Sequence, residues 1–130
     1  MKFYIASSLK NAGQVRELSH LLKCAGWEHT YDWTIHLEKD IDGTVLKAIG
    51  EKELEGVKQA DIVIILTPQG RGTHIELGIA IALGKQVYLC HRDASYFQFD
   101  GNTCTFYWLP QVKRLVGDTK DIARELLQLS

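Results

Sequence analysis

Glu76 has the surroundings that make it the first candidate for chemistry in this sequence. It lies in a short segment, 74–83, that is apolar on nearly every side, with Ile75, Leu77 and Ile79 among its neighbours. Burying a carboxylate among such residues is costly and needs a compensating role. One interpretation is an exposed glutamate that the helix macrodipole favours in the first turn. We favour the other, a nucleophilic or basic carboxylate at a crevice, held ionised by the N-terminus of that helix.

Glu53 is a second carboxylate in an unexpected position. On a helical wheel it falls in the middle of an apolar stripe formed by Leu46, Ile49, Val57 and Ala60. Either the helix is rotated or short and Glu53 is solvated, or its carboxyl group faces a crevice with a raised pKa and serves as proton donor or substrate contact. Two acids in different surroundings are what cleavage at a sugar anomeric carbon requires, one as nucleophile and one to handle the leaving-group proton.

The elements that would position Glu76 form one continuous unit. It consists of a strand at 62–66, a glycine-rich break at 68–72, a helix at 74–83 and a strand at 86–90. The first strand is an uninterrupted apolar run, which is typical of a strand buried on both faces. Gly84 ends the helix, at the position where a left-handed residue is favoured.

Further strands and helices alternate along the rest of the chain. Short apolar or aromatic runs predict strands at 2–7, 27–33 and 105–109, and helical spacing predicts helices at 11–25, 44–59 and 119–129. Gly26 ends the first of these helices, Pro110 halts the last strand, and Asp118 is the expected N-cap of the last helix.

This alternation implies right-handed crossovers and a parallel sheet covered by helices on both faces. We therefore predict one α/β domain spanning 1–130, with a doubly wound sheet of five parallel strands in the order 2-1-3-4-5. Ligands of such sheets bind beyond the carboxyl ends of the strands at the switch point, here between the first and third strands. That position is expected to gather three loops around one crevice, at 7–11, 68–73 and 91–102.

A polar cluster of Ser7, Ser8, Lys10 and Asn11 joins the first strand to the first helix. It needs no ligand if it only caps that helix. Alternatively, hydroxyls, backbone N–H groups and a lysine at a helix start bind an anion such as a 5'-phosphate. The chain has neither a GxGxxG pattern nor a Walker sequence, so a dinucleotide or nucleoside-triphosphate site has weak support.

Two aromatic residues and two histidines belong near the expected crevice. Tyr4 is a core residue by default, although its hydroxyl could reach the crevice and orient Glu76. Trp33 is either a core anchor or a surface on which a base stacks. His74 and His91 border the crevice without a second ligand at a metal spacing, so helix-cap or loop roles are favoured over a metal site.

Composition and charge exclude several classes of protein. The chain has 130 residues, of which 45% are hydrophobic and 24% are charged, as in ordinary globular domains. A net charge of -1 provides no footprint for nucleic acid or an anionic membrane. No apolar run approaches the roughly 18 residues that span a bilayer, and no signal-peptide pattern is present. Cys24, Cys90 and Cys104 have no metal spacing and are expected to be reduced, mostly buried thiols in a cytoplasm.

Three stretches resemble the nucleoside 2-deoxyribosyltransferase family, including its branch of 2'-deoxynucleoside 5'-phosphate N-hydrolases. They are Tyr4-Ile5-Ala6-Ser7-Ser8, Ala60-Asp61-Ile62-Val63 and, most specifically, Gly72-Thr73-His74-Ile75-Glu76-Leu77-Gly78 continuing to Gly84-Lys85. The resemblance covers most of the chain, from Met1 to about Cys90. It implies a flavodoxin-like fold, a homo-oligomer such as a dimer with active sites near subunit interfaces, and no metal or organic cofactor.

The resemblance also implies roles for individual residues. Glu76 matches the nucleophile that attacks C1' of a 2'-deoxyribosyl group, and Tyr4 matches the tyrosine that orients it. Glu53 falls where the family often has an aspartate that helps to protonate the base. Ser8 and Lys10 match positions that contact the 5' end of the substrate.

The remaining candidates for substrate binding are Ser7, Trp33, Gly70, Gly72 and Asn102. Asn102 lies within one residue of a family position that reaches into the neighbouring subunit's site. Gly70 is a departure, because the family places an aspartate or a serine at this point, six residues before the nucleophile.

The sequence therefore predicts an enzyme that cleaves or exchanges the N-glycosidic bond of a 2'-deoxynucleoside or its 5'-monophosphate. Its partner would be a small molecule, with no nucleic acid and no membrane. Gly70 supports an alternative, a non-catalytic domain that binds or senses a nucleotide. A third hypothesis is a scaffold domain in which Glu76 is only a structural residue at the start of a helix.

Overall fold

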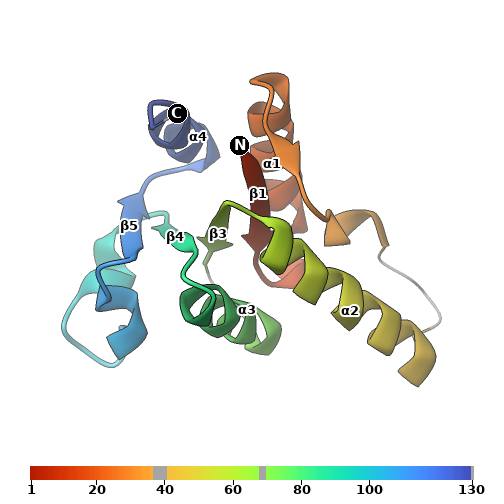
Figure 1. Cartoon of the computed structure of the whole chain (residues 1–130). Helices are drawn as coiled ribbons and strands as arrows, with labels where there is room; N and C mark the ends of the chain where they lie inside the picture. The colour runs from red at the N-terminus through yellow and green to blue at the C-terminus, as the bar shows by residue number, and fades with distance from the viewer. Residues whose placement is uncertain (37–40, 68–69, 130) are drawn as a thin grey trace.

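A five-stranded parallel sheet forms the middle layer of the protein (Figure 1), whose computed structural model describes residues 1–36, 41–67 and 70–129. Its strands are β1 (Lys2–Ala6), β2 (Glu28–His29), β3 (Ile62–Leu66), β4 (Gln86–His91) and β5 (Val112–Val116). Their spatial order is β2-β1-β3-β4-β5, and every neighbouring pair is parallel. The predicted α/β fold and strand order are confirmed.

Four α-helices cover the two faces of this sheet. The helices α1 (Ala12–Cys24) and α4 (Thr119–Leu127) pack together on one face, while α2 (Gly43–Gln59) and α3 (Arg71–Ala82) cover the other (Figure 1). The short 3-10 helices are η1 (Leu9–Asn11), η2 (Trp33–His36), η3 (Ala94–Phe97) and η4 (Thr105–Trp108). Within the described part of the chain, none of the helices combines the length and the apolar character needed to cross a membrane.

The central strands β1 and β3 form the part of the sheet that supports the site. All five residues of β3 are buried, as its uninterrupted apolar run predicts. In β1, Tyr4 pairs with Val63 of β3, and its side chain is completely buried. Gly26 and Gly84 follow α1 and α3 with φ angles of 93° and 72°, the left-handed conformation that glycine adopts without strain.

The second predicted strand, 27–33, is too long. β2 contains only two residues, because the carboxylate of Asp32 accepts a hydrogen bond from the backbone N–H of Thr34 (2.9 Å) and the chain turns into η2. Trp33 therefore begins a 3-10 helix and does not end a strand.

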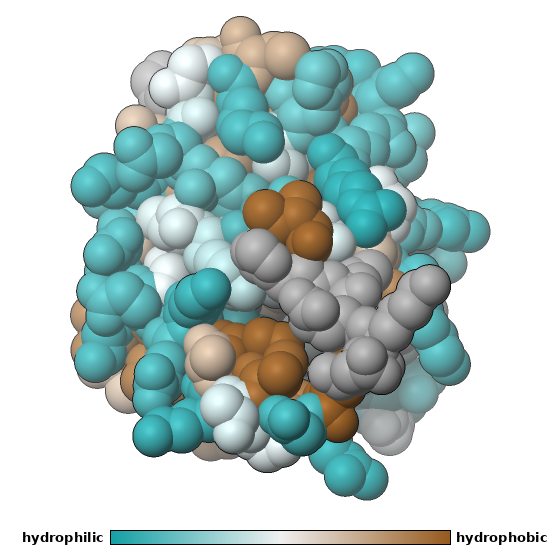
Figure 2. Space-filling model, turned by 90° about the vertical axis from the view of Figure 1, so that its right-hand side faces the viewer, coloured by the Kyte–Doolittle hydropathy of each residue, from teal (hydrophilic) through white to brown (hydrophobic). Residues whose placement is uncertain are grey.

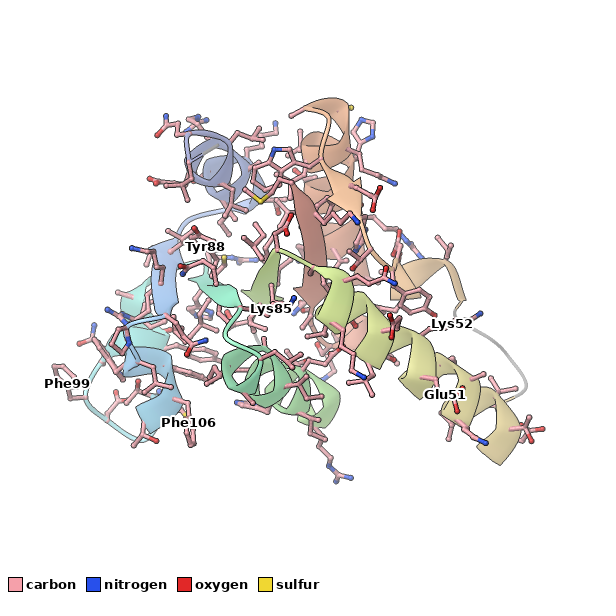
Figure 3. The ribbon with its side chains drawn as sticks, viewed as in Figure 1. Glu51, Lys52, Lys85, Tyr88, Phe99 and Phe106 are labelled. Carbon is pink, nitrogen blue, oxygen red and sulfur yellow. The ribbon has the colours of Figure 1, made fainter. Side chains whose placement is uncertain are left out.

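The fifth predicted strand, 105–109, is wrong. This aromatic run forms η4, in which Tyr107 is buried while Phe106 is 57% exposed and points away from the body of the molecule (Figure 3). The strand itself is β5, which begins after Pro110. β5 is an edge strand in which Lys113 and Arg114 are exposed. Because these charged residues interrupt its apolar pattern, the sequence does not indicate a strand here.

Two smaller expectations concern α4 and the cysteines. Asp118 caps α4 as predicted, since its carboxylate accepts a hydrogen bond from the backbone N–H of Asp121 (2.9 Å). All three cysteines are unpaired, but only Cys90 is buried; Cys104 is half-buried and Cys24 is exposed. The expectation of mostly buried thiols is therefore wrong for Cys24.

Candidate active site

A cavity of about 660 Å³ opens between α2, α3 and the segment that follows β1. We call it the acid cavity, because Glu53 and Glu76 supply its carboxylates. The other predicted site residues that line it are Ser7, Ser8, Lys10, Trp33, Gly70 and Gly72. Its remaining wall consists of Leu9, Ile41, Leu46, Ile49 and Thr73.

The mouth of the acid cavity is apolar. Ile41 and Leu46 line the cavity and are still 56% and 57% exposed. Figure 2 shows the side of the molecule on which the N-terminal end of α2 lies, where apolar side chains gather on an otherwise mostly hydrophilic face. An apolar wall of this kind suits a flat, uncharged heterocycle better than a strongly charged group.

Glu76 is the most deeply placed carboxylate of the cavity, with 7% of its surface exposed. The hydroxyl of Tyr4 donates a hydrogen bond to its Oε2 atom. Burial raises the pKa of Glu76 to about 8, the hydrogen bond from Tyr4 opposes that shift, and the nearby charge of Glu53 adds to it. Burial and the charge of Glu76 also raise the pKa of Tyr4 far above its usual value, so its hydroxyl remains a donor.

The position of Glu76 in its helix differs from the prediction. α3 begins at Arg71, three residues earlier than expected, so Glu76 lies in the second turn. The field of a helix N-terminus falls off within the first turn, and burial then dominates the electrostatics of the carboxyl group. The expectation that the helix start holds Glu76 ionised is therefore wrong, as is the view of Glu76 as an exposed first-turn residue.

Glu53 faces the acid cavity from α2. It is half-buried, its charge raises the pKa of Glu76, and burial is the main cause of its own raised pKa. Its neighbours Glu51 and Lys52 are exposed and extend away from the body of the molecule (Figure 3). The apolar stripe around Glu53 thus serves two purposes: Val57 enters the core, whereas Leu46 lines the cavity.

The polar cluster after β1 does not cap a helix through its side chains. Neither Ser8, before η1, nor Asn11, before α1, makes a side-chain capping hydrogen bond, so that interpretation is wrong. Asn11 Nδ2 donates to Ser7 Oγ (2.9 Å), which donates to the carbonyl of Leu66 (2.8 Å). The Oγ atom of Ser8 is buried at the cavity wall without a hydrogen-bond partner among the described residues, and Lys10 is exposed beside it.

Trp33 and the two glycines form opposite parts of the wall. Trp33 is 8% exposed, and its Nε1 atom donates to the carbonyl of Ile5 (2.8 Å), so it is a core anchor that also lines the cavity. A Cβ atom at Gly70 would meet only Ser8 Cβ, at 3.9 Å, and one at Gly72 would meet nothing within 4 Å. Both glycines therefore leave open space in the cavity wall.

The predicted third loop, 91–102, does not line the acid cavity. Its first residues line a second cavity of about 410 Å³, on the side of the sheet where α1 and α4 lie. The loop follows β4, one strand farther from the switch point, and its Phe99 ring contacts Trp108 of η4. Asn102 also lies outside the acid cavity, with its backbone N–H donating to Asp100 (2.8 Å), and its predicted contact with a neighbouring subunit stays a prediction.

The two histidines make local contacts. His74 lies close to the carbonyl of Gly70 (3.3 Å) and the hydroxyl of Tyr107 (3.2 Å), and His91 lies in the second cavity, where it hydrogen-bonds to Thr67 and Ser95. Among the residues that the structure describes, no group of three His, Cys, Asp or Glu side chains could hold a metal ion.

Sequence reasoning missed part of the wall. Leu46 and Ile49 were assigned to a core stripe, and their spacing around Glu53 was the signal that this face of α2 borders a site. Ile41 lies in a polar loop and carried no such signal. It reaches the cavity only because the N-terminal end of α2 projects past the sheet (Figure 1).

Comparison with known protein families identifies the family of this chain. The family model for nucleoside 2-deoxyribosyltransferases matches residues 3–122. The chain belongs to the nucleoside 2-deoxyribosyltransferase family. The resemblance on which the sequence prediction rests is thereby confirmed. The match extends beyond Cys90 as far as Ile122 in α4. No curated protein sequence matches the chain.

Solved structures show the same fold at low sequence identity. A Clostridium botulinum CMP N-glycosidase is 20% identical, with a TM-score of 0.64 over 97% of this chain and 98% of that one. A 2-deoxyribosyltransferase from Bacillus psychrosaccharolyticus is 21% identical, with a TM-score of 0.68 over 95% and 90%. A conserved protein from Enterococcus faecalis V583 is 18% identical, with a TM-score of 0.64 over 100% and 99%. These three proteins thus share the overall fold of this chain.

Proposed function

We propose that this protein cleaves or exchanges the N-glycosidic bond of a 2'-deoxynucleoside or its 5'-monophosphate. The observation that carries the proposal is the hydrogen bond from Tyr4 to Glu76, with a second carboxyl group, that of Glu53, in the same acid cavity. Membership of the nucleoside 2-deoxyribosyltransferase family supports it. A cavity of about 660 Å³ lies in the size range of small-molecule sites and would hold a nucleoside or nucleotide.

The two acids would act as a pair that holds one proton. Burial raises the pKa of both carboxyl groups and the charge of Glu53 raises that of Glu76 further, so the two protons leave in separate steps and one proton stays with the pair between them. When the proton lies on Glu53, Glu76 is an ionised nucleophile whose charge Tyr4 stabilises, and Glu53 is an acid. One shared proton therefore supplies both functions.

The proposed reaction has two steps. In the first, a carboxylate oxygen of Glu76 forms a bond to C1' of the sugar, the electron pair of the C1'–N bond passes to the base, and Glu53 gives its proton to the base. In the second, water or another base attacks C1', Glu53 takes the proton of the attacking group, and the bond to Glu76 breaks. Water completes a hydrolysis and a base completes a transfer.

The part of the cavity that Ser8 and Lys10 line would receive the 5' end of the substrate. Ser8 offers a buried hydroxyl without a described partner, and Lys10 offers a positive charge beside it. These groups suit a phosphate, which favours the 5'-monophosphate over the free nucleoside. We further infer that the protein works as a homo-oligomer, in which Asn102 lies near the site of a neighbouring subunit.

A second candidate function is a non-catalytic domain that binds or senses a nucleotide. Gly70 favours it, because this glycine stands where the family places an aspartate or a serine and leaves open space in the wall. A domain of this kind would keep the cavity and release its ligand unchanged.

Chromatography of released base tests the proposal. The protein is incubated with each 2'-deoxynucleoside and each 5'-monophosphate, with and without a second free base, beside Glu76→Gln as the control. Base release that requires Glu76 supports the enzyme, and its dependence on the second base separates transfer from hydrolysis. Recovery of every substrate intact, with thermal stabilisation by one of them, would support the binding domain.

A further inference from the structure

Gly56 is the point at which α2 comes closest to the sheet. A Cβ atom at this position would lie 2.9 Å from Cβ of Tyr31 and 3.0 Å from the ring of Tyr4. Carbon atoms in contact prefer about 3.5–4.0 Å, so the helix can approach this closely only without a side chain. The other glycine inside α2, Gly50, differs: a Cβ atom there would meet nothing within 4 Å.

A hydrogen bond holds the same point of the helix from the sheet side. Thr30 Oγ1 donates to the carbonyl of Gly56 (2.7 Å), while the backbone N–H of Thr30 donates to the carbonyl of Phe3 in β1 (2.9 Å). The Gly56 carbonyl belongs to the last turn of α2, where carbonyls have no partner within the helix. Thr30 therefore satisfies an orphan acceptor and ties the end of α2 to the edge of the sheet.

This contact lies close to the pair of carboxyl groups, Glu53 and Glu76. Glu53 precedes Gly56 by three residues, so both face the same side of α2. The ring that touches Gly56 belongs to Tyr4, whose hydroxyl donates to Glu76. The separation of α2 from β1 at Gly56 thus fixes the separation of Glu53 from the bonded pair of Tyr4 and Glu76.

We propose that Gly56 and Thr30 are positioning residues, which hold α2 at the distance where Glu53 lies beside Glu76 in the acid cavity. A methyl group at Gly56 would displace the helix by roughly 1 Å to restore ordinary carbon contacts. A displacement of that size would weaken the interaction between the two carboxyl groups, which depends on their separation. The contacts alone support the role of Gly56 and Thr30 in placing α2, whereas the consequence for turnover rests on the proposed function.

The groups that face the pair are few and come from three directions. Tyr4 faces Glu76 from β1, and Tyr4 and Tyr31 both lie within electrostatic range of Glu53. Lys10 lines the same cavity from the segment after β1. Displacing α2 moves Glu53 away from Glu76 and leaves Tyr4 bonded to it, so the coupling between the two acids is the property that changes.

The test compares Gly56→Ala with Gly50→Ala, the same change in the same helix at an open position. Carbon-13 NMR titration of glutamate carboxyl groups in the free protein reads the coupling directly. In the wild type and in Gly50→Ala, the pair titrates in two separated steps. In Gly56→Ala, the two steps move together. For turnover, kcat of Gly56→Ala falls about 100-fold with KM within about threefold of wild type, because a misplacement near 1 Å costs about that much.

A second pair of variants keeps the test decisive if Gly56→Ala does not fold. Thr30→Val removes the hydroxyl with little change of shape, and Thr30→Ser keeps it. Thr30→Val merges the two titration steps and Thr30→Ser restores them. Separated steps and unchanged kcat in a folded Gly56→Ala, or in Thr30→Val, would overturn the proposal. If Glu76→Gln still releases base while Gly56→Ala merges the titrations, the proposed function fails and the positioning role stands.

Discussion

The acid cavity and the second cavity open at the same edge of the sheet, but their carboxylates are in opposite states. In the second cavity, Asp93 accepts from the backbone N–H of Ser95 (2.9 Å) and Asp118 accepts from that of Asp121 (2.9 Å). Hydrogen bonds from these partners lower the pKa of both aspartates. In the acid cavity, burial raises the pKa of both glutamates.

This difference in pKa separates carboxylates that stabilise the fold from carboxyl groups that can exchange a proton with a substrate. A carboxylate whose oxygens accept backbone N–H groups holds its charge and orders the chain, but it has no proton to give. A buried carboxyl pair keeps a proton near neutral pH and can exchange it with a substrate. Of the two cavities, the acid cavity is therefore the one to which we assign the proposed proton transfer and nucleophilic attack.

The largest expected effect is the loss of turnover in Glu76→Gln. Removing the nucleophile lowers base release by at least about 1,000-fold, since such residues contribute several orders of magnitude to rate. The matched change in the second cavity, Asp93→Asn, leaves base release within about threefold of wild type. Chromatography of the base measures both variants. Equal losses in the two variants would break the distinction between the cavities.

The next effect concerns the hydrogen bond from Tyr4. Tyr4→Phe removes the hydroxyl that stabilises ionised Glu76 and leaves the buried ring in place. A hydrogen bond to a charged group contributes about 1.5–3 kcal/mol, so kcat falls about 10- to 100-fold. The pKa of Glu76 rises further, which carbon-13 NMR of its carboxyl group detects. Wild-type turnover with an unchanged pKa would show that Tyr4 is only a core residue.

The proposed mechanism predicts a rate that depends on pH, because it needs the acid pair in its singly protonated form. As pH rises through about 8, the pair loses its last proton and the acid is missing. As pH falls through the lower pKa of the pair, both groups are protonated and the nucleophile is missing. We therefore expect a bell-shaped profile of kcat with an alkaline limb near pH 8. In Glu53→Gln this alkaline limb is absent, and a limb that persists there would contradict the shared proton.

A smaller effect distinguishes the two ends of the acid cavity. Lys10→Ala removes an exposed positive charge, which raises KM for a 5'-monophosphate about threefold to tenfold. KM for the corresponding 2'-deoxynucleoside changes less than about twofold, because that substrate has no phosphate. Steady-state kinetics with the matched pair of substrates provides the measurement. Equal changes for both substrates would exclude a phosphate site at Lys10.

The smallest effects are on stability, and they have opposite signs in the two cavities. The folded state of Glu76 has a raised pKa, so its stabilising contribution is complete at low pH and is lost as pH rises through about 8. Glu76→Gln is therefore more thermostable than wild type at pH 9, by about 3 °C or more. Asp118→Ala loses the cap of α4 and melts about 3–6 °C lower than wild type. Thermal scans at pH 6 and pH 9 measure both, and a destabilised Glu76→Gln at pH 9 would contradict the account.

The sequence predicted the parts of the fold that depend on long apolar patterns. The buried run of β3, the glycine after α3 and the strand order follow from residues that have few alternative arrangements. The position of β5 did not follow, because an edge strand tolerates charges and the aromatic run before it looks more like a strand. The packing of η4 against β5 determines which of the two segments forms the strand, and the local sequence does not specify that packing.

The site was predictable in its residues and less so in its electrostatics. Glu53 and Glu76 were singled out as carboxylates in apolar surroundings, and the structure places both in the acid cavity. Under our proposal, the separation of the two carboxyl groups depends on the close approach of α2 to β1 at Gly56. That approach is a property of the assembled layers, and Gly56 alone did not indicate it in the sequence.

Rapid-quench mass spectrometry tests the central claim, the covalent role of Glu76, most directly. The protein is mixed with a substrate that releases base, quenched in acid within one turnover, and weighed intact. The account predicts a transient gain in mass equal to one deoxyribosyl group, or its 5'-phosphate, located on the peptide that contains Glu76 and absent from Glu76→Gln. Release of base at the wild-type rate by Glu76→Gln, with no adduct on either protein, would contradict it.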